Sequence, residues 1–362
     1  MNLAVLGVGL IGGSIGLAAR RRSGCEVVGF DPERRTLESA VEAGAIDRAA
    51  ASPTAACDGA EVVFCAAPVG RLPGLAEAAL EVCGPDAVVT DVGSTKRDIV
   101  AALGADERFI GGHPLAGAET SGVRNAREDL FEGARWYLTP EAERSSGLLY
   151  DRLQRTVAGL GAKVQAIDAE THDRLMATVS HLPHVVANVL VSQAAAELTR
   201  DSERMPEVGP SFRDTARVAG ANPAIWGDIF ASNRDAVAEA VDAVARRLGE
   251  AAELIRAGER DAVAEWHSAA AADRRRLLET ELSGGPLREL RVVVTNKPGT
   301  VAELALALGE AGVNIEDMAL YPAPDMTSGA VSLWVPGDEQ AARAEKLVRE
   351  LGHTVSVVGN GA

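Results

Sequence analysis

A glycine-rich turn near the start of the chain constrains the fold more than any other feature. Residues 7–12 read GVGLIG, which is the pattern Gly-x-Gly-x-x-Gly. An apolar run precedes the turn at Leu3–Leu6, a helical pattern continues from it at Ile11–Arg22, and a second apolar run follows at Glu26–Phe30. Strand, glycine turn, helix and strand in this order are typical of the first βαβ unit of a Rossmann-type, doubly wound parallel sheet. The fold class predicted for this part of the chain is therefore α/β.

The same turn predicts a site for a nicotinamide dinucleotide. In such a motif Gly7 permits a tight turn, Gly9 lets a pyrophosphate approach the backbone, and Gly12 lets the helix pack close to the strand. The amides at the helix N-terminus then face the phosphates. Glycine-rich turns are also common where no ligand binds, but here a strand and a helix flank the motif as a nucleotide site requires.

The choice between NAD and NADP depends on the end of the second strand. Asp31 stands there, where its carboxylate can accept hydrogen bonds from ribose hydroxyls and repel a 2′-phosphate. NAD is therefore the expected cofactor, although Arg34 and Arg35 lie close enough to leave NADP as an alternative. The predicted cofactor-binding residues are Gly7, Gly9, Leu10, Ile11, Gly12, Asp31, Pro68 and Ser94.

The composition indicates the class of protein and its partners. A chain of 362 residues is long enough for two or three domains. The formal net charge of −16 disfavours nucleic acid and anionic membranes as partners, because the protein's field repels both. The four cysteines form no CxxC pair and have no clustered histidines, so neither a metal site nor a disulfide framework is predicted. The expected location is the cytoplasm.

The first two of three predicted domains differ in their patterns. Residues 1–165 form the NAD-binding Rossmann domain, because apolar runs at 61–67 and 87–91 extend the parallel sheet. Residues 166–283 form an all-helical domain for substrate binding and dimerisation. Apolar side chains between 169 and 200 cover more than one helical face, so we expect burial against a second subunit and hence a homodimer.

The last part of the chain restarts with a strand pattern after a compact linker at 283–286. Residues 287–362 then follow the order strand, helix, strand, strand, helix, strand. This βαββαβ order predicts a small α+β domain with a ferredoxin-like sandwich.

Four further motifs are more specific than the glycine turn. They read GGHPLAG at 111–117, DVGSTK at 91–96, HLPH at 181–184, and FRDTAR at 212–217 followed by Trp226. In these residues, and in their order along nearly the whole chain, the sequence resembles the prephenate dehydrogenase family. That family oxidises prephenate with NAD in tyrosine biosynthesis, releasing carbon dioxide and 4-hydroxyphenylpyruvate, and some relatives use arogenate and give tyrosine. The resemblance therefore implies an NAD-dependent dehydrogenase acting on one of these small molecules.

The resemblance implies that His113 is the catalytic base. Removing the ring hydroxyl proton drives hydride to the nicotinamide, and the carboxylate on the opposite ring carbon leaves as carbon dioxide while the ring becomes aromatic. A neutral imidazole, with a usual pKa near 6.5, suits this step. The setting of His113 between Gly112 and Pro114 predicts a loop at the carboxyl end of a strand, and the alternative is a core or helix-capping histidine. Ser94 is expected to hydrogen-bond the same hydroxyl or the nicotinamide side, or else to cap a helix that starts at Lys96.

The resemblance also supplies the substrate-binding residues. Arg217 is expected to bind the ring carboxylate with a bidentate guanidinium, and Arg213 lies four residues earlier on the same predicted helical face. His184 is expected at the pocket, whereas His181 is a candidate core residue. This histidine pair has no third ligand, so no metal site is predicted there. Glu119 is expected to orient the substrate at the pocket entrance, or alternatively to cap a turn.

Two residues bear on the surroundings of the pocket. Ala118 replaces a hydroxylated residue of some relatives, which keeps both prephenate and arogenate open as substrates. Trp226 is expected in the core or, by the resemblance, near the pocket of the neighbouring subunit.

The third domain resembles the ACT domain, a regulatory module that binds amino acids between paired copies. The residues that carry this resemblance read NKPGTV at 296–301 and GVNI at 312–315, where Gly312 also suits a helix C-cap. The Pro-Gly turn presents backbone donors at a helix N-terminus, where the carboxylate of an amino acid can sit. Feedback inhibition by tyrosine is expected from the logic of the pathway. The predicted effector-binding residues are Asn296, Pro298, Gly299, Val301, Asn314 and Ile315.

Two other functions compete with this interpretation. One is another β-hydroxyacid-type dehydrogenase, but those enzymes usually place a lysine on the long helix, where this chain has His181 and His184. The other is an amino-acid sensor that kept the cofactor fold without turnover. The joint presence of His113, Ser94 and Arg217 disfavours a sensor.

Overall fold

The computed structural model describes residues 1–117, 120–141, 147–198, 208–279, 287–295, 297–322 and 328–358. They form two compact units, Met1–Leu248 and Gly249–Ala362. Glu119, Asn296 and the predicted linker at 283–286 lie outside the described residues. The division into three domains remains a prediction.

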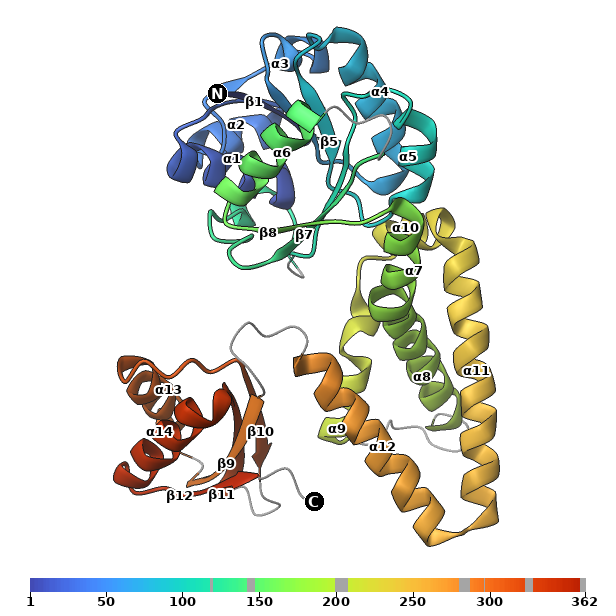
Figure 1. Cartoon of the computed structure of the whole chain (residues 1–362), viewed down its shortest axis with the longest axis vertical. Coiled ribbons are helices and arrows are strands. Elements are labelled where there is room, and N and C mark those ends of the chain that lie inside the picture. The colour runs from blue at the N-terminus through green and yellow to red at the C-terminus, as the bar shows by residue number, and fades with distance from the viewer. Residues whose placement is uncertain are drawn as a thin grey trace. The chain divides into compact units, whose positions relative to one another are not determined.

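The first unit is built on a five-stranded parallel sheet, which confirms the predicted Rossmann-type fold (Figure 1). Its strands are β1 Asn2–Leu6, β2 Glu26–Phe30, β3 Arg48–Ala49, β4 Val62–Cys65 and β5 Val88–Asp91. The order in the sheet is β3-β2-β1-β4-β5, so the chain adds strands on one side of β1 and then on the other. Sheets of this kind bind ligands at the carboxyl ends of the strands where the order reverses, here between β1 and β4.

Helices cover both faces of this sheet (Figure 1). One face packs against α1 (Leu10–Ser23), α2 (Arg34–Glu42) and α6 (Gly147–Gly159), and the other against α3 (Pro53–Cys57), α4 (Leu72–Val82) and α5 (Arg97–Leu103). Because side chains alternate along a strand, Leu3 and Val5 of β1 enter the first core and Ala4 and Leu6 enter the second.

A second, three-stranded sheet in this unit carries His113. β6 (Gly111–Pro114) pairs antiparallel with β7 (Arg135–Thr139), and β7 pairs parallel with β8 (Lys163–Ala166). The loop predicted around His113 is therefore wrong, because His113 lies in β6 opposite Tyr137 of β7.

Close packing explains why glycines form this strand. Glycine and proline are usually disfavoured inside strands, so the sequence around His113 predicts a loop. A Cβ on Gly111 would lie 2.4 Å from Oγ1 of Thr139, and one on Gly112 would lie 2.6 Å from the carbonyl oxygen of Asp91. Only glycine lets β6 run this close to its neighbours, and Pro114 stands at the strand's end, where it is tolerated.

The long helix predicted over 169–200 is interrupted by a wider turn. α7 (Ala169–Met176) and α8 (Leu182–Leu198) are joined by a π-helical turn at Ala177–His181. The expected burial on several faces is not found in the single chain, since Val179 is 56% and Val189 is 62% exposed. These exposed valines form an apolar face of the kind that a second subunit covers.

The stretch Ala169–Glu197 is also long and apolar enough, by length and composition, to cross a membrane, a test that core helices pass too. Near its start, however, His172 and Asp173 are buried and hydrogen-bonded to residues of β6 and of the first turn of α5. These contacts anchor the helix in the first unit.

The remaining helices are α9 (Pro210–Ala216), a 3-10 turn at Arg217–Gly220, α10 (Pro223–Ser232), α11 (Arg234–Ala257) and α12 (Arg260–Glu279). Asn222 is the N-cap of α10, because its side-chain oxygen accepts hydrogen bonds from the amides of Ala224 and Ile225. α10 and α11 are separated at Asn233, whose side chain is fully buried.

The second unit contains a four-stranded antiparallel sheet with two helices on one face. Its elements are β9 (Leu287–Thr295), α13 (Thr300–Glu310), β10 (Asp317–Pro322), β11 (Ser328–Pro336), α14 (Gly337–Glu350) and β12 (Thr354–Val358). The βαββαβ order and the sheet order β10-β11-β9-β12 are those of a ferredoxin-like sandwich, as the sequence predicted. The Val313 amide bonds back to the Leu308 carbonyl and closes the end of α13 after Gly312, whose φ is +74°, and β10 then starts at Asp317.

Candidate active site

The glycine turn between β1 and α1 has the geometry of a phosphate-binding turn. Gly7 has a φ of +98°, and a Cβ there would lie 2.2 Å from the carbonyl oxygen of Ala66. A Cβ on Gly12 would lie 1.9 Å from the carbonyl oxygen of Gly7. A Cβ on Gly9, in contrast, would meet nothing within 4 Å. The fold itself therefore requires Gly7 and Gly12, whereas the space beside Gly9 is what an approaching pyrophosphate needs.

Asp31 follows β2, and its carboxylate lies against this turn. Oδ2 accepts a hydrogen bond from the Val8 amide at 3.1 Å, and Oδ1 accepts one from the Glu33 amide at 2.9 Å. A carboxylate fixed at the edge of the phosphate turn is suited to ribose hydroxyls. Arg34 instead pairs with Glu38 of its own helix and its side chain is 90% exposed, so the arrangement fits NAD better than NADP.

The other predicted cofactor residues lie on the same side of the sheet. Leu10 and Ile11 form the first turn of α1, Pro68 follows β4, and Ser94 lies in the loop after β5. Because β1, β4 and β5 are neighbouring parallel strands, their carboxyl ends bring these residues to one edge.

His113 belongs to a chain of three buried side chains. Its Nδ1 lies 2.9 Å from Nε2 of His172, and Nδ1 of His172 lies 2.8 Å from Oδ1 of Asp173. His113 is 8% exposed, and the other two are more deeply buried. Burial, followed by the proximity of His172, Lys96 and His181, holds the pKa of His113 well below its usual value. The imidazole is therefore neutral near pH 7.

Asp173 ties this chain to the loop that carries Ser94. Oδ1 accepts a hydrogen bond from the Lys96 amide at 2.8 Å, and Oδ2 accepts one from the Arg97 amide at 2.9 Å. A side chain of α7 therefore caps α5, and the capping role considered for Ser94 is wrong. Burial raises the pKa of Asp173, but the hydrogen bonds from His172 and from the two amides outweigh it and the pKa is lowered. Asp173 is thus a carboxylate at neutral pH.

A buried ion pair lies beneath the same loop. The ammonium of Lys96 bonds to Oδ2 of Asp91, the last residue of β5, and neither side chain has exposed surface. Asp91 also accepts hydrogen bonds from the amides of Gly93 at 2.7 Å and Gly112 at 3.0 Å. Burial lowers the pKa of Lys96, and the attraction of Asp91 opposes that shift. One carboxylate thus joins the Ser94 loop to the strand of His113.

Residues at the end of α10 also bond to Thr95 and Asp173. The hydroxyl oxygens of Ser232 and Thr95 lie 2.8 Å apart. Nδ2 of Asn233 donates to the carbonyl oxygen of Asp173 at 2.8 Å and lies 3.2 Å from Nδ1 of His181. Burial lowers the pKa of His181 to about 4. His181 is therefore a buried, hydrogen-bonded core residue, as expected.

His184 and Arg217 lie together at the next turn of α8. The His184 ring stacks on Trp226 with centroids 3.5 Å apart, and the His181 ring meets the same indole edge-on at 5.9 Å. Burial lowers the pKa of His184; the carbonyl of Val218 raises it and the charge of Arg217 lowers it further. Hydrogen bonds and ring contacts thus run without a break from His113 to the neighbourhood of Arg217.

Arg213 lies apart from this network. Its guanidinium donates to the carbonyl oxygen of Val208 at 2.7 Å, and the residue is exposed. α9 ends at Ala216, and Arg217 begins the 3-10 turn. The Arg213 side chain is thus bonded to its own segment of the chain, and Glu119 lies outside the described residues.

Sequence reasoning missed the residues that hold His113 in place. They are Asp91, Lys96, His172, Asp173 and Asn233. A signal was present for the third and fourth, because an adjacent histidine and aspartate on an apolar helix must find buried partners. Within the motif at 91–96 the sequence predicts a role for Ser94 alone.

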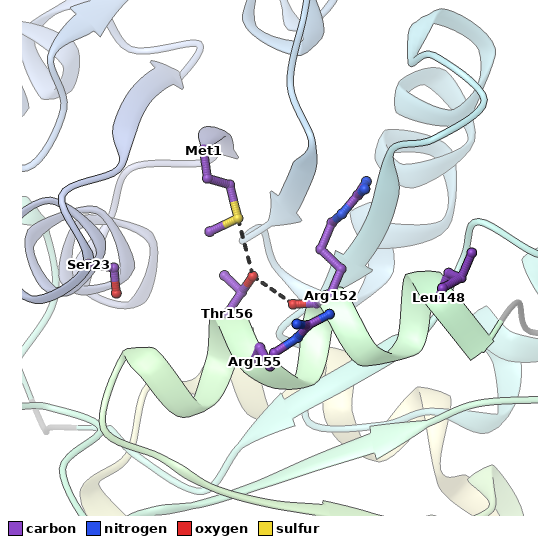
Figure 2. A pocket seen from close by; sticks show the side chains of 6 residues that line it. All are labelled: Met1, Ser23, Leu148, Arg152, Arg155 and Thr156. Atoms are coloured by element: carbon purple, nitrogen blue, oxygen red, sulfur yellow. Dashed lines mark hydrogen bonds between the residues drawn. The ribbon is translucent and has the colours of Figure 1, made fainter.

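Two features lie outside this site. All four cysteines are buried free thiols, and within the described ranges no three His, Cys, Asp or Glu side chains are grouped to hold a metal ion. A hollow beside α6, drawn in Figure 2, is lined by Met1, Ser23, Leu148, Arg152, Arg155 and Thr156. Figure 2 shows the Thr156 hydroxyl bonded to the Arg152 carbonyl and the Met1 sulfur. None of the predicted site residues lines this hollow.

The chain is similar to known proteins over most of its length. A family model described as "Prephenate dehydrogenase, nucleotide-binding domain" matches residues 15–166, and one described as "Prephenate dehydrogenase, dimerization domain" matches residues 168–268. The prephenate dehydrogenase of Bacillus subtilis (strain 168) is 30% identical over 96% of this chain and 95% of its own length.

Solved structures show the same likeness. The prephenate dehydrogenase from A. aeolicus, in complex with hydroxyphenyl propionate and NAD+, has a TM-score of 0.71 and 31% identity over 76% of this chain and 98% of that one. Synechocystis arogenate dehydrogenase has a TM-score of 0.68 and 29% identity over 76% of this chain and all of that one. With its cofactor turn, its buried imidazole and this similarity over nearly its full length, the chain belongs to the prephenate dehydrogenase family.

Proposed function

We propose that this chain catalyses the NAD-dependent oxidative decarboxylation of prephenate to 4-hydroxyphenylpyruvate. Membership of the family supports this class of reaction. The prephenate dehydrogenase of Bacillus subtilis is similar to this chain over nearly its whole length, which supports prephenate as the substrate. The observation that carries the chemistry is the buried, neutral imidazole of His113, held beside the cofactor edge of the sheet.

The residues at that edge fit NAD. The space beside Gly9 admits a pyrophosphate, and Asp31 is held where ribose hydroxyls can donate to it. When bound, the cofactor supplies the acceptor for the hydride. The solved A. aeolicus relative contains NAD+, which supports the same cofactor here.

His113 acts as the general base in this proposal. It takes the proton of the ring hydroxyl, so that the O–H bond breaks and the oxygen electron pair forms a carbonyl as hydride leaves the same carbon. The carbon–carboxylate bond then breaks, and its electrons restore the aromatic ring. Ser94 hydrogen-bonds the hydroxyl or the nicotinamide side.

Arg217 binds the ring carboxylate in this proposal, with His184 beside it. A guanidinium presents a fork of donors that matches a carboxylate. Arg213 remains a secondary candidate for substrate binding, and Glu119 is expected to orient the substrate at the pocket entrance.

Arogenate is the second candidate substrate, because the Synechocystis arogenate dehydrogenase is similar over its full length. The two compounds differ at the side chain, while the hydroxyl and the ring carboxylate are shared. His113 and Arg217 therefore suit either one.

The third domain is proposed to be an ACT domain that binds tyrosine. Its βαββαβ topology supports this, as does Gly299, which has a φ of +94° and is the N-cap of α13, because a helix N-terminus after such a turn suits a carboxylate. The effector residues are Asn296, Pro298, Gly299, Val301, Asn314 and Ile315. Unchanged turnover in millimolar tyrosine and phenylalanine would remove this part of the proposal.

A cytoplasmic homodimer with three domains, at 1–165, 166–283 and 287–362, completes the proposal. The match of residues 168–268 to a dimerization domain and the exposed valines of the π turn and α8 support the dimer. The buried free thiols fit a reducing compartment. Sedimentation at micromolar concentration is expected to show a dimer, and a monomer alone would contradict it.

The central test compares substrates and one variant. The full chain is incubated with NAD and either prephenate or arogenate, and reduced cofactor is followed by absorbance. Prephenate is expected to give the higher kcat/KM. His113→Asn is expected to lower kcat by about 10²- to 10⁴-fold while NAD still binds. A variant as fast as the parent at neutral pH would reject His113 as the base.

A further inference from the structure

Two of the buried residues near His113 have no role in the reaction proposed above. His172 and Asp173 are 0% and 2% exposed, and both point their polar atoms into the chain that starts at His113. We propose that His172 and Asp173 are positioning residues that fix the tautomer of His113, so that Nε2 is the atom that takes the substrate's proton. This inference takes the identity of the base from the proposed function, whereas the hydrogen-bonded chain on which it is built is observed independently of that function.

The assignment starts from Asp173, which as a carboxylate can only accept hydrogen bonds. Nδ1 of His172, 2.8 Å from Oδ1, must therefore carry a hydrogen and donate. A neutral His172 then has a bare Nε2, which can only accept. Nδ1 of His113, 2.9 Å from that atom, must carry the hydrogen between them. The bare nitrogen of neutral His113 is thus Nε2.

The orientation of Asp173 is fixed by the backbone. The amides of Lys96 and Arg97 donate to its two oxygens at 2.8 and 2.9 Å, and its own carbonyl accepts from Asn233 at 2.8 Å. The carboxylate therefore cannot turn away from His172 without leaving buried amides unpaired. A side chain held in this way passes its orientation through His172 to the His113 ring.

The charge of Asp173 matters once the proton has moved. When the substrate O–H bond breaks and the Nε2–H bond forms, His113 becomes a cation in a buried site. Burial and the ammonium of Lys96 oppose that charge. Asp173 acts in the other direction through His172, so the chain supports the protonated state that the reaction produces.

The groups that face His113 come from several elements. They are His172 and Asp173 from α7, Lys96 just before α5, His181 from the π turn and Tyr137, which lies opposite His113 on β7. Asp91 at the end of β5 accepts a hydrogen bond from the amide of the neighbouring Gly112. Tyr137 also packs edge-on against His172 with centroids 5.6 Å apart. Asp173 is the one among these whose carboxylate reaches His113 through a hydrogen-bonded ring.

The direct test reads the tautomer in the full-length enzyme. The chain has six histidines, so selective ¹⁵N-histidine labelling gives few signals to assign. Two-bond ¹H–¹⁵N spectra at neutral pH are expected to show His113 with a protonated Nδ1 and a bare Nε2, and His172 likewise. A His113 protonated on Nε2 in the resting enzyme would overturn the inference.

Variants test the link to turnover. His172→Phe removes the acceptor and is expected to mix the His113 tautomers and lower kcat about 10²-fold, with KM changed less than threefold. His172→Gln keeps an acceptor near the Nε2 position and is expected to recover about tenfold of that loss. His267→Gln, an exposed site on α12, is the matched control and is expected to leave both readouts unchanged.

Asp173→Asn separates charge from shape. Losing the negative charge disfavours protonated His113, so the acidic limb of the kcat profile is expected to move to lower pH while kcat falls. A merely structural role would lower the folded fraction without moving that midpoint or the tautomer, and this result would overturn the inference. If the tautomer is as expected but His113→Asn stays fully active, the proposed function fails and the positioning geometry stands.

Discussion

Lys96 and Asp91 form an ion pair in which neither side chain has any exposed surface. Two backbone amides, from Gly93 and Gly112, also donate to Asp91. A buried charge that loses its partner is costly, because neither water nor another group replaces it. The pair therefore holds the Ser94 loop and β6 together through one carboxylate.

We expect Lys96→Met to lower the free energy of unfolding by about 3–5 kcal/mol, because it leaves Asp91 buried without its cation. Urea titration monitored by far-UV circular dichroism measures the change. Arg34→Met is the matched control, since the Arg34–Glu38 pair is exposed and such pairs contribute at most about 1 kcal/mol. Equal losses in the two variants would show that burial of the pair is not what matters.

Acid is expected to destabilise the first unit through its buried histidines. Burial lowers the pKa of His181 from its usual 6.5 to about 4, and it lowers that of His113 as well. The unfolded chain then binds protons that the folded chain does not, so stability is complete above pH 6.5 and is lost as the pH falls toward 4. For His181 alone the loss is roughly 3 kcal/mol.

The thermal midpoint measured between pH 7 and pH 4 tests this dependence. His181→Gln is expected to flatten the slope of the curve, whereas His267→Gln, on an exposed helical site, is expected to leave it parallel to the parent. If His181→Gln leaves the slope of thermal midpoint against pH unchanged, groups other than His181 cause the acid sensitivity.

Asp31 is expected to control the choice of cofactor. Asp31→Ala removes the acceptor that lies against the Val8 amide and the charge that repels a 2′-phosphate. KM for NAD is expected to rise at least about tenfold, and the preference over NADP to shrink. Glu33→Ala is the control, because only its backbone amide meets Asp31. A larger change in KM for Glu33→Ala than for Asp31→Ala would show that the residues after Asp31 determine the cofactor preference.

Arg217 and Arg213 are expected to behave differently. Arg217→Lys keeps the charge but loses the fork, so KM for the cyclic substrate is expected to rise about tenfold or more with a smaller change in kcat. Arg213→Lys is expected to change KM less than about twofold, since its guanidinium bonds to the Val208 carbonyl. Steady-state kinetics with saturating NAD distinguish the two, and a reversed order would exchange their roles.

Local patterns predicted the Rossmann-type sheet and the ferredoxin-like domain because the determining contacts are close in sequence. The glycine turn, the apolar runs and the Asn222 cap each act over a few residues. The strand of His113 could not be predicted in this way. Gly111 and Gly112 are explained by Thr139 and Asp91, which approach them from other elements.

Some residues of the candidate site could be predicted from local motifs, and others could not. His113, Ser94 and Arg217 stand in recognisable motifs, so the sequence pointed to them directly. His172, Asp173 and Asn233 acquire their places only when α7 and α10 meet the start of α5. Their partners are 59 to 77 residues away along the chain, beyond the reach of any local pattern.

Because a carboxylate from α7 caps α5, the route for substrate exchange is constrained. Separating these two helices would break both capping bonds and pull the His172 ring away from its neighbour, leaving the base misaligned at each opening. Substrate entry and exit that preserve this alignment therefore leave α7 and the start of α5 together.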